Sequence, residues 1–332
     1  MPNISLPDFM KTYNNLWQTF ISKENFEIAL HDSQLGKKKQ RQVITFNKNP
    51  EENLEKTRQD VINGRFHTSR YKAMIVFEPK KRVIYKLPYN PDRIVQHAVM
   101  NILRPIMESM FIYDSYACVE GKGQMRASRR CSQFVRRNKY CLKCDVHHFY
   151  PSIRHDILSA MLHKKIKDDR FMGIVDDIIF SFDGETNAPI GNYTSQWFGN
   201  FYLTALDYFI KQELGVKDYL RYCDDFLLFS NDKAELHEYR RIIEKFLWEE
   251  LRLTYSKAYV FDTKQGVDFC GYRTFVKYVL LRKSTAKRVK RRVLRVYPKY
   301  TEEKRQASIA STLGWLKHCN SYNLRVKLGL IK

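Results

Sequence analysis

The 332-residue sequence lacks several features that would place it in a specialised class of protein. It has no apolar run near the roughly 18 uncharged residues that a membrane-spanning helix requires. Glycine and proline number only 13 and 10, which excludes collagen-like and low-complexity chains. Seven cysteines, an odd number, fit a reducing compartment better than a disulfide framework. Residues 1–8 have neither the basic start nor the apolar run of a secretory signal, so we expect a cytoplasmic protein with no membrane partner.

What the chain has in excess is positive charge. Its 58 Lys and Arg residues outnumber its 36 Asp and Glu residues, giving a formal net charge of +22. Residues 118–143 hold eight basic residues and one acid, and residues 279–332 hold fifteen and two. These 80 residues therefore carry +20 of the total. Positive charge gathered in this way favours nucleic acid as a partner over an anionic membrane or an acidic protein.

The pattern of apolar residues predicts an α+β fold, because strands and helices mix without a regular alternation. The first 60 residues and residues 157–179 have a helical pattern, as does the segment from Ile190 to Leu214. Further helices are expected after Asp92, after Asn231, from Arg282 onward and around Trp315, with Asp92 and Asn231 as candidate N-caps. The expected strands are 74–77 and 83–85, which form a hairpin with a basic tip, and 140–146, 219–222 and 226–229.

Two adjacent carboxylates stand between the last two of these strands. The segment Tyr222-Cys223-Asp224-Asp225-Phe226 places them where a hairpin turns, between arms too apolar for a surface loop. Asp-Asp pairs are common in ordinary turns, where they bond the local backbone. Like charges held between apolar arms repel, however, and a divalent cation is the simplest compensation.

A second acid favours the metal-binding interpretation. Asp145 lies at the end of the strand 140–146 and is followed by the aromatic residues Phe149 and Tyr150. Two metal ions about 4 Å apart need shared carboxylates to activate an attacking oxygen and to stabilise a leaving one. Together with the basic segments, this pattern predicts a nucleotidyl transferase.

These segments resemble the motifs of reverse transcriptases. Asp145 with its aromatic tail is similar to motif A, and the Tyr-Cys-Asp-Asp hairpin is similar to motif C. The resemblance runs in order from about residue 71 to 330: residues 82 and 92–97 resemble the fingers motifs, 251–257 motif D, 269–273 the primer-grip hairpin and the basic tail the thumb. It implies a right-hand polymerase fold with an antiparallel palm sheet flanked by helices. The implied domains are a helical segment 1–70 joining the fingers, fingers 71–140, palm 141–278 with a helical insertion at about 155–190, and thumb 279–332.

The resemblance also implies site residues. The catalytic acids would be Asp145, Asp224 and Asp225, which bind two Mg²⁺ ions (with Mn²⁺ as a substitute) together with the backbone carbonyl of Val146. The nucleotide-binding residues would be Lys80, Arg82, Tyr150, Ile190, Gly191, Gln196 and Lys257. Tyr150 would be the ring that excludes a ribose 2′-hydroxyl, and Lys257 a proton donor to the leaving pyrophosphate. The residues contacting template and primer would be Arg126, Arg129, Arg130, Arg136, Arg137, Gly271, Lys287, Arg288, Arg291, Arg292 and Arg295.

Within this superfamily, the sequence is most similar to the reverse transcriptases of bacterial or phage diversity-generating retroelements. Residues 188–196, Ala-Pro-Ile-Gly-Asn-Tyr-Thr-Ser-Gln, resemble their signature, and most other relatives carry Gln-Gly at Ile190-Gly191. The resemblance implies copying errors at template adenines. It also implies a template RNA, a cDNA primer that is extended with deoxynucleoside triphosphates, and an oligomeric accessory variability protein. A non-mutagenic reverse transcriptase, defence-associated or derived from a group II intron, and a degenerate fold kept for RNA binding are the alternatives.

Three other patterns have simpler interpretations. Cys141 and Cys144 suggest zinc, but no second pair follows, so they are expected in the core. Adjacent His147 and His148 cannot both reach one ion from a strand and are expected to be structural. The segment 121–123, Gly-Lys-Gly, lacks the rest of a phosphate loop and is expected to be a turn before a basic helix.

Overall fold

The computed structural model describes residues 11–77 and 81–331. The chain divides into two compact units. The first consists of Met1–Ile112, Val146–Glu213 and Ile243–Ser256, and the second of Tyr113–Asp145, Leu214–Ile242 and Lys257–Lys332. Helices and antiparallel sheets occur without regular alternation, which confirms the predicted α+β class. The finer division into fingers, palm and thumb stays a prediction. Within the described residues, no helix is both long and apolar enough to span a bilayer.

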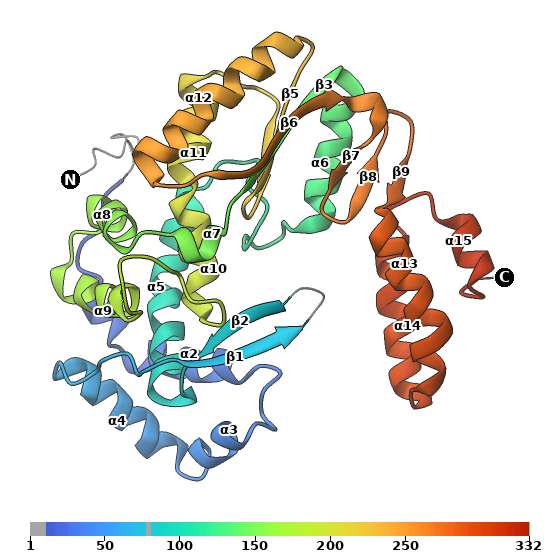
Figure 1. The fold of residues 1–332 in the computed structure, drawn as a ribbon. Coiled ribbons are helices and arrows are strands. Elements are labelled where there is room, and N and C mark those ends of the chain that lie inside the picture. The colour runs from blue at the N-terminus through green and yellow to red at the C-terminus, as the bar shows by residue number, and fades with distance from the viewer. Residues whose placement is uncertain (1–10, 78–80, 332) are drawn as a thin grey trace. The chain divides into compact units, whose positions relative to one another are not determined.

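The first unit is mainly helical and carries one hairpin (Figure 1). Its helices are α1 (Trp17–Phe20), α2 (Lys23–Gln34), α3 (Arg41–Phe46), α4 (Pro50–Ile62), α5 (Ile94–Met110), α7 (Phe149–Ser152), α8 (His155–Lys165), α9 (Asp169–Phe180), α10 (Tyr193–Tyr202) and α11 (Thr204–Tyr208), with π-turns at Tyr89–Arg93 and Phe209–Glu213. The central helix α5 packs against α2 and α10, and nearly its whole first half is buried. The hairpin pairs β1 (Lys72–Phe77) with β2 (Lys81–Lys86), as predicted, and residues 78–80 of its tip lie outside the described residues.

Three local predictions in the helical regions are wrong in detail. The segment 157–179 is two helices, α8 and α9, because Asp168 leaves the helical conformation and caps α9 by accepting the Phe171 N–H at 3.1 Å. Asp92 does not cap α5, which begins after a π-turn; its buried carboxylate accepts the Ser69 N–H at 2.8 Å instead. Asn231 is not the cap of α12 (Lys233–Leu251), because Asp232 accepts the Ala234 N–H there at 2.8 Å.

The second unit contains two antiparallel sheets. The four-stranded sheet has the order β4-β5-β3-β6, formed by β4 (Tyr219–Tyr222), β5 (Asp225–Ser230), β3 (Tyr140–Val146) and β6 (Tyr255–Asp262). The three-stranded sheet has the order β7-β8-β9, formed by β7 (Val267–Phe269), β8 (Tyr272–Thr274) and β9 (Val279–Leu281). Its helices are α6 (Gln124–Arg137), the first part of α12, α13 (Lys283–Arg291), α14 (Glu302–Leu316) and α15 (Tyr322–Lys327), with short 3-10 or π segments at Thr263–Gln265, Arg292–Val296 and Tyr297–Lys299. The predicted strand 140–146 and the predicted helices from Arg282 and around Trp315 are confirmed.

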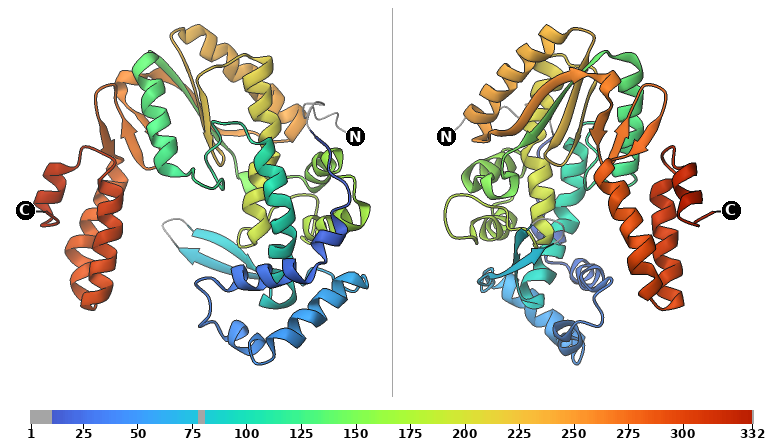
Figure 2. Two further views of the ribbon diagram at one scale, coloured as in Figure 1. Left: turned by 180° about the vertical axis from the view of Figure 1, so that it is seen from behind. Right: turned by 45° about the vertical axis from the view of Figure 1, so that its right-hand side comes forward.

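One face of the four-stranded sheet is apolar at one end and charged at the other. Helix α6 packs against β4, β7 and β8 and covers the apolar end, as Figures 1 and 2 show. Its buried partners include Cys141 of β3, Leu220 of β4 and Phe229 of β5. Because side chains alternate along a strand, Lys143 and Asp145 lie on the same face of β3 as Cys141. The sheet therefore carries its charged groups on a rigid support, beyond the end of its own hydrophobic core.

Candidate active site

Three residues lie side by side across the charged end of this face. In the antiparallel register Asp145 of β3 pairs with Asp225 of β5, and Asp225 pairs with Tyr222 of β4. Directly paired residues project from the same face of an antiparallel sheet, with Cβ atoms about 4.5–5.5 Å apart. The pairing thus brings together two acids that are 80 positions apart in the sequence.

The third acid lies in the turn between β4 and β5. Only Cys223 and Asp224 separate the two strands, and Cys223 has the left-handed conformation that suits a two-residue hairpin, with φ of 55°. This conformation costs a non-glycine residue about 1 kcal/mol. The fully buried Arg221 holds the turn, since its guanidinium donates to the Cys223 carbonyl oxygen at 3.0 Å.

Burial and neighbouring charge shift the pKa values of Asp224 and Asp225. Burial raises the pKa of Asp224 to about 6, and the negative charges of Asp145 and Asp225 add to the rise. Burial also raises the pKa of Asp225, whereas the neighbouring Lys143 ammonium lowers it. Such a cluster is short of positive charge, and carboxylate oxygens are the ligands that Mg²⁺ prefers.

The chemistry of this donor set therefore fits a divalent cation. Asp145 and Asp224 are the two carboxylates that would hold it, and Val146 ends β3 directly after Asp145, so its carbonyl is adjacent. Asp225 differs from them, since its oxygens lie 3.2 and 3.3 Å from Lys143 Nζ. Within residues 11–77 and 81–331, no group of three or more His, Cys, Asp or Glu side chains is placed to hold one ion. The predicted contribution of Asp225 to metal binding stays a prediction.

A second hairpin lies beside these acids in the same unit. Strands β7 and β8 are joined by Cys270 and Gly271, whose φ values of 48° and 84° are typical of a type I′ turn. This primer-grip hairpin, β7–β8 with its turn, is where the sequence predicts contact with a primer. A Cβ at Gly271 would lie 2.9 Å from Trp315 Cζ3, so the indole of α14 packs directly on the turn.

The comparison with known families identifies the chain. The sequence model of the family "Reverse transcriptase (RNA-dependent DNA polymerase)" matches residues 72–274, more than half of the sequence. The chain is a reverse transcriptase family member. The matched region contains Asp145, Asp224, Asp225 and the primer-grip hairpin. Membership supports RNA-directed DNA polymerase activity, an RNA template and nucleotide substrates, and reverse transcriptases generally use divalent metals, usually Mg²⁺.

Individual relatives are distant. The protein is 24% identical to Protein YkfC of Escherichia coli (strain K12) over 279 residues, which are 68% of this chain and 71% of that protein. It is 28% identical over 137 residues to an uncharacterized 91 kDa protein in a cob intron of Schizosaccharomyces pombe, covering 39% of this chain and 17% of that one. Two solved telomerase structures, from Candida albicans with a TWJ fragment of telomeric RNA and from Candida tropicalis in the apo form, match with TM-scores of 0.49 at 12% identity. They cover 70% and 67% of this chain, which spans about half of each telomerase chain.

The predicted sugar-excluding residue of this reverse transcriptase lies in the first unit. Tyr150 is half-buried in the short helix α7. Its ring packs on the backbone of α10, where a Cβ at Gly199 would lie 3.0 Å from Tyr150 Cε1. The Tyr150 ring thus packs directly on the Gly199 backbone, and this contact restricts the positions that the ring can adopt.

The segment Ile190-Gly191 packs on the β1–β2 hairpin of the same unit. The Ile190 carbonyl oxygen accepts the Tyr85 N–H of β2 at 2.8 Å. Gly191 has a φ of +126°, and a Cβ there would lie 2.4 Å from the Tyr85 carbonyl oxygen. The Arg93 guanidinium donates to the Gly191 carbonyl oxygen at 3.2 Å. Only glycine fits this approach, so the glycine of the signature has a structural reason.

The other predicted nucleotide-binding residues are distributed over both units. In the first unit, Arg82 is exposed on β2, paired in register with Val76, and Gln196 is exposed on α10. In the second unit, Lys257 is exposed on β6, the strand next to β3. Lys80 lies outside the described residues.

The arginines of α6, predicted to contact the template, fall into two groups. Arg126, Arg129 and Arg136 are exposed, and Arg129 Nη2 lies 3.3 Å from His318 Nδ1. The other two bind carboxylates of their own unit: Arg130 Nε donates to Asp114 at 2.8 Å, and Arg137, which is also exposed, donates from Nε to Asp218 at 2.7 Å. The predicted contact of Arg130 and Arg137 with nucleic acid therefore competes with an internal ion pair.

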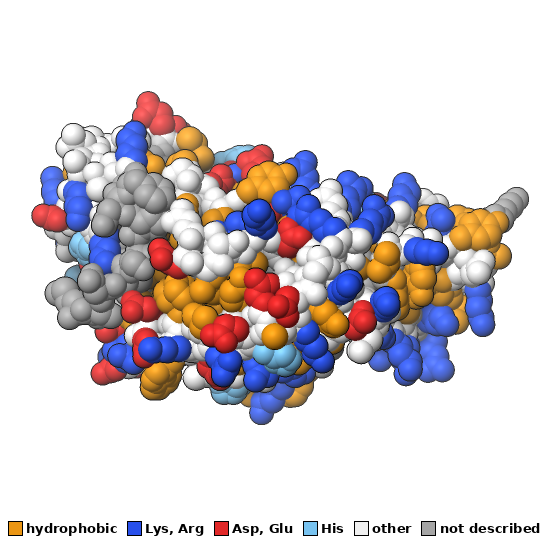
Figure 3. Space-filling model, turned by 90° about the horizontal axis from the view of Figure 1, so that it is seen from above, with side chains coloured by type: hydrophobic (Ala, Val, Ile, Leu, Met, Phe, Trp, Pro, Cys, Tyr) orange, Lys and Arg blue, Asp and Glu red, His pale blue; other side chains and the backbone are white. Residues whose placement is uncertain are grey.

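The basic residues after Arg282 form a continuous exposed face. Lys and Arg side chains gather toward the right-hand end of the surface in Figure 3, where the C-terminal residues lie. In α13 and the π-helical segment Arg292–Val296, all of the residues predicted to contact primer and template are exposed: Lys287, Arg288, Arg291, Arg292 and Arg295. The predicted apolar stripe between them, Val289, Val293 and Val296, is half-buried. This segment is amphipathic, with its charges free to meet a polyanion.

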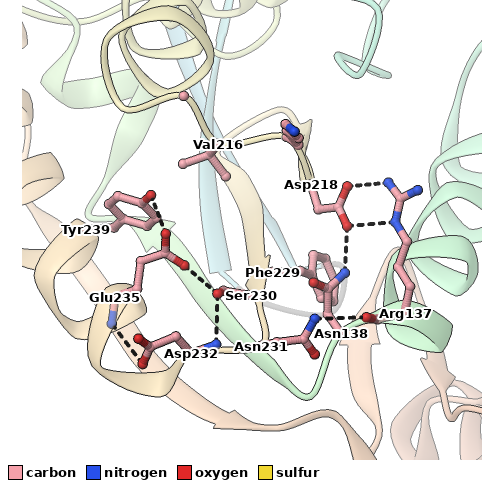
Figure 4. A pocket seen from close by; sticks show the side chains of 12 residues that line it. Arg137, Asn138, Val216, Asp218, Phe229, Ser230, Asn231, Asp232, Glu235 and Tyr239 are labelled. Atoms are coloured by element: carbon pink, nitrogen blue, oxygen red, sulfur yellow. Dashed lines mark hydrogen bonds and ion pairs between the residues drawn. The ribbon is translucent and has the colours of Figure 1, made fainter.

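A cavity of about 790 Å³ lies at the opposite end of β4 and β5 from the carboxylates (Figure 4). Its polar walls bind one another: Arg137 and Asn138 donate to Asp218, and Ser230 and Tyr239 donate to Glu235. Residues of the predicted catalytic site do not line it. The polar side chains that line the cavity therefore hydrogen-bond to one another, and the cavity is separate from the Asp145, Asp224 and Asp225 carboxylates.

The expected structural roles of the cysteines fit the structure. Cys141 and Cys144 are both buried in β3, and all seven cysteines are free. Sequence analysis missed Lys143, Arg221, Asp268 and Arg282, which support the acids or the primer-grip hairpin. A charged residue within an apolar strand, as at Lys143 and Arg221, is the signal that identifies the first two.

Proposed function

We propose that this protein is an RNA-directed DNA polymerase that copies a template RNA into cDNA by two-metal phosphoryl transfer. The observation that carries the proposal is the pairing of Asp145 with Asp225 next to the two-residue turn that holds Asp224. Two Mg²⁺ ions, when bound, would activate the primer 3′-hydroxyl and stabilise the leaving pyrophosphate. Asp145, Asp224 and the Val146 carbonyl would hold them, with Asp225 in support.

The residues of the first unit would select the nucleotide. Tyr150 would block a ribose 2′-hydroxyl, and Arg82, with Lys80, would hold the triphosphate. The exposed arginines of α6 and the basic face of α13 would bind template and duplex through phosphates, without reading sequence. Lys257 would donate a proton to the leaving pyrophosphate.

Primer extension on a heteropolymeric RNA template tests the polymerase proposal. Asp224→Asn should lower the extension rate on the order of a thousandfold, because it removes a negative metal ligand without changing the side-chain size. Asp232→Asn is the matched control, since Asn also caps helices and this site lies at the far end of β5. Equal yields from wild type and Asp224→Asn would overturn the proposal.

We further propose that the enzyme is mutagenic and belongs to a diversity-generating retroelement. Ile190 stands where most reverse transcriptases carry glutamine. An isoleucine can contact the nascent base pair through its shape alone, without a hydrogen bond. Loss of such a polar contact reduces discrimination by about 1–3 kcal/mol. The contacts of Ile190-Gly191 with β2 fix the backbone there. The side chain at position 190 would therefore determine the difference in base discrimination.

Sequencing of the products tests the mutagenic role. Wild type should misincorporate chiefly opposite template adenine, and Ile190→Gln should lower that error about tenfold. Ile190→Val, which keeps the side chain apolar, should not. Equal, low error opposite all four template bases would exclude the mutagenic role and leave the polymerase proposal intact.

The second candidate function is that of a non-mutagenic reverse transcriptase. The relative from S. pombe is described as a protein in a cob intron, which favours an intron-derived enzyme. The DNA flanking the gene discriminates: a near-duplicate repeat pair that differs at adenines supports the mutagenic role. The mutagenic role would also require an oligomeric accessory variability protein. Co-purification with the native operon products would reveal it.

A further inference from the structure

Lys143 is a nearly buried lysine at the centre of the catalytic sheet. Its side chain is only 12% exposed, and it precedes Asp145 by two residues on the same face of β3. Its ammonium lies 3.2 Å from Asp225 Oδ1 and 3.3 Å from Asp225 Oδ2, and it donates to the Asp268 carbonyl oxygen at 2.6 Å. One amine thus joins β3, β5 and β7.

The contacts continue from Asp268 to the start of α13. The Asp268 carboxylate accepts from Arg282 Nε, and the Arg282 N–H donates to the Gly271 carbonyl oxygen at 3.0 Å. Arg282 is also the residue from which α13 begins. The chain of contacts therefore runs from Asp225 through Lys143 to the primer-grip hairpin and to the root of the basic helix.

The charges explain why the ammonium is placed there. A buried carboxylate without a partner is costly, and burial already works against the ionised form of Asp225. Lys143 compensates this charge within the protein. Asp145 and Asp224, beside this ion pair, are the two carboxylates that would hold a cation.

We infer that Lys143 is a positioning residue that fixes Asp225 to the primer-grip hairpin and keeps it from acting as a full metal ligand. The inference rests on the proposed function and deepens it. Lys143 sets the net charge that a divalent cation meets, and it couples the position of the primer end to the catalytic acids. It would act through its contacts with Asp225 and Asp268.

Mn²⁺ binding by the full chain, without primer or nucleotide, tests the charge role. Lys143→Met removes one positive charge close to the acids, so Mn²⁺ should bind about tenfold more tightly, measured by electron paramagnetic resonance of free Mn²⁺. Lys143→Arg keeps the charge and should bind Mn²⁺ within twofold of wild type. Lys139→Met is the matched control, an exposed lysine just before β3, and should also leave binding unchanged.

Primer-extension kinetics test the positioning role. Lys143→Met should raise the KM for primer–template about fivefold and lower kcat, whereas Lys143→Arg should recover part of both. Arg282→Gln leaves the Lys143–Asp225 pair in place, so it should raise the primer–template KM and change Mn²⁺ affinity less than Lys143→Met does, because Arg282 acts on Asp225 through its charge without a direct contact. A merely structural lysine would lower thermal stability without this separation of effects.

Two results would overturn the inference. The first is a folded Lys143→Met protein whose Mn²⁺ affinity lies within twofold of wild type. The second, which applies if Lys143→Met fails to fold, is an Arg282→Gln enzyme with an unchanged primer–template KM. Absence of extension by wild type would instead count against the proposed function, since Mn²⁺ binding needs no turnover.

Discussion

The ring of Tyr150 rests against the backbone of Gly199, with no room for a side chain between them. A Cβ at Gly199 would lie 3.0 Å from Tyr150 Cε1 and equally close to Phe149 Cε1. Contacts under 3.4 Å require the neighbour to move, so the two aromatic rings and Gly199 define one another's positions.

The first prediction follows from this contact. Tyr150→Ala should raise the incorporation of ribonucleotides relative to deoxynucleotides roughly 10–100-fold, because the 2′-hydroxyl then meets no ring. Gly199→Ala displaces the ring without removing it and should move the ratio in the same direction by less. Competition between each rNTP and its dNTP in primer extension measures both, and an unchanged ratio for Tyr150→Ala would exclude the steric role.

The second prediction concerns the glycine docked on β2. Gly191→Ala should lower the free energy of unfolding by on the order of 2–4 kcal/mol. The new methyl group would clash with the Tyr85 carbonyl oxygen, and alanine rarely adopts the φ found here. Gly184→Ala is the control, since Gly184 has a φ of +98° with nothing within 4 Å of its Cβ position. It should cost only about 1 kcal/mol. Urea unfolding of the two variants measures the difference, and equal costs would show that the close approach does not matter.

The third prediction is a pH dependence of stability. Burial lowers the pKa of His97 to about 4, with help from the positive charges of Arg93 and Lys37, and the imidazole stacks on Tyr193 at 4.1 Å between centroids. The unfolded chain therefore binds a proton at higher pH than the folded chain does. The stabilising contribution is complete above the ordinary pKa of about 6.5 and is lost as the pH falls toward 4, by on the order of 2 kcal/mol.

Unfolding experiments between pH 7 and pH 4 measure this contribution. His97→Phe keeps the ring stack and should flatten the dependence, whereas His31→Phe, at an exposed position, should not. A His97→Phe profile that follows wild type would assign the pH dependence to other groups.

The fourth prediction separates arginines that face a polyanion from those that serve the fold. Arg288→Ala removes an exposed charge of α13, so it should weaken duplex binding and lower the salt dependence by roughly one counterion. Arg137→Ala removes a partner of Asp218 and should lower stability, with little change in the salt dependence of binding. Binding isotherms over a range of KCl concentrations distinguish them; equal slopes for the two variants would contradict the assignment.

The elements nearest the acids were predictable from sequence because their signals are local. The strand 140–146 and the arms of the Tyr222–Phe226 hairpin are short apolar runs bounded by polar residues, and all three strands form as expected. The adjacency of Asp145 and Asp225 needed more than pattern, since nothing in the spacing fixes which strands pair. The expectation that they meet came from the needs of a two-metal centre and from the resemblance, and the register places the two acids opposite each other.

Other features depend on tertiary context that no local pattern carries. Asp92 looks like a helix cap in sequence, yet Ser69, 23 residues earlier, provides its hydrogen-bond donor. Helical periodicity continues across residues 157–179, and the break appears only because Asp168 also accepts the distant Trp17 N–H at 2.8 Å. In the sequence, Arg130 and Arg137 belong to one basic segment. Only the folded structure shows that they bind Asp114 and Asp218.

The tightness of the β4–β5 turn limits how the chain can change in length. One residue added between Tyr222 and Asp225 that slipped the pairing of β5 would move Asp225 to the opposite face of the sheet, away from Lys143 and Asp145. Insertions and deletions in this part of the gene are therefore incompatible with the pairing of Asp145 and Asp225 across the sheet. Tags, labels or added loops belong at exposed connections such as the one around Gly184, which leaves that face untouched.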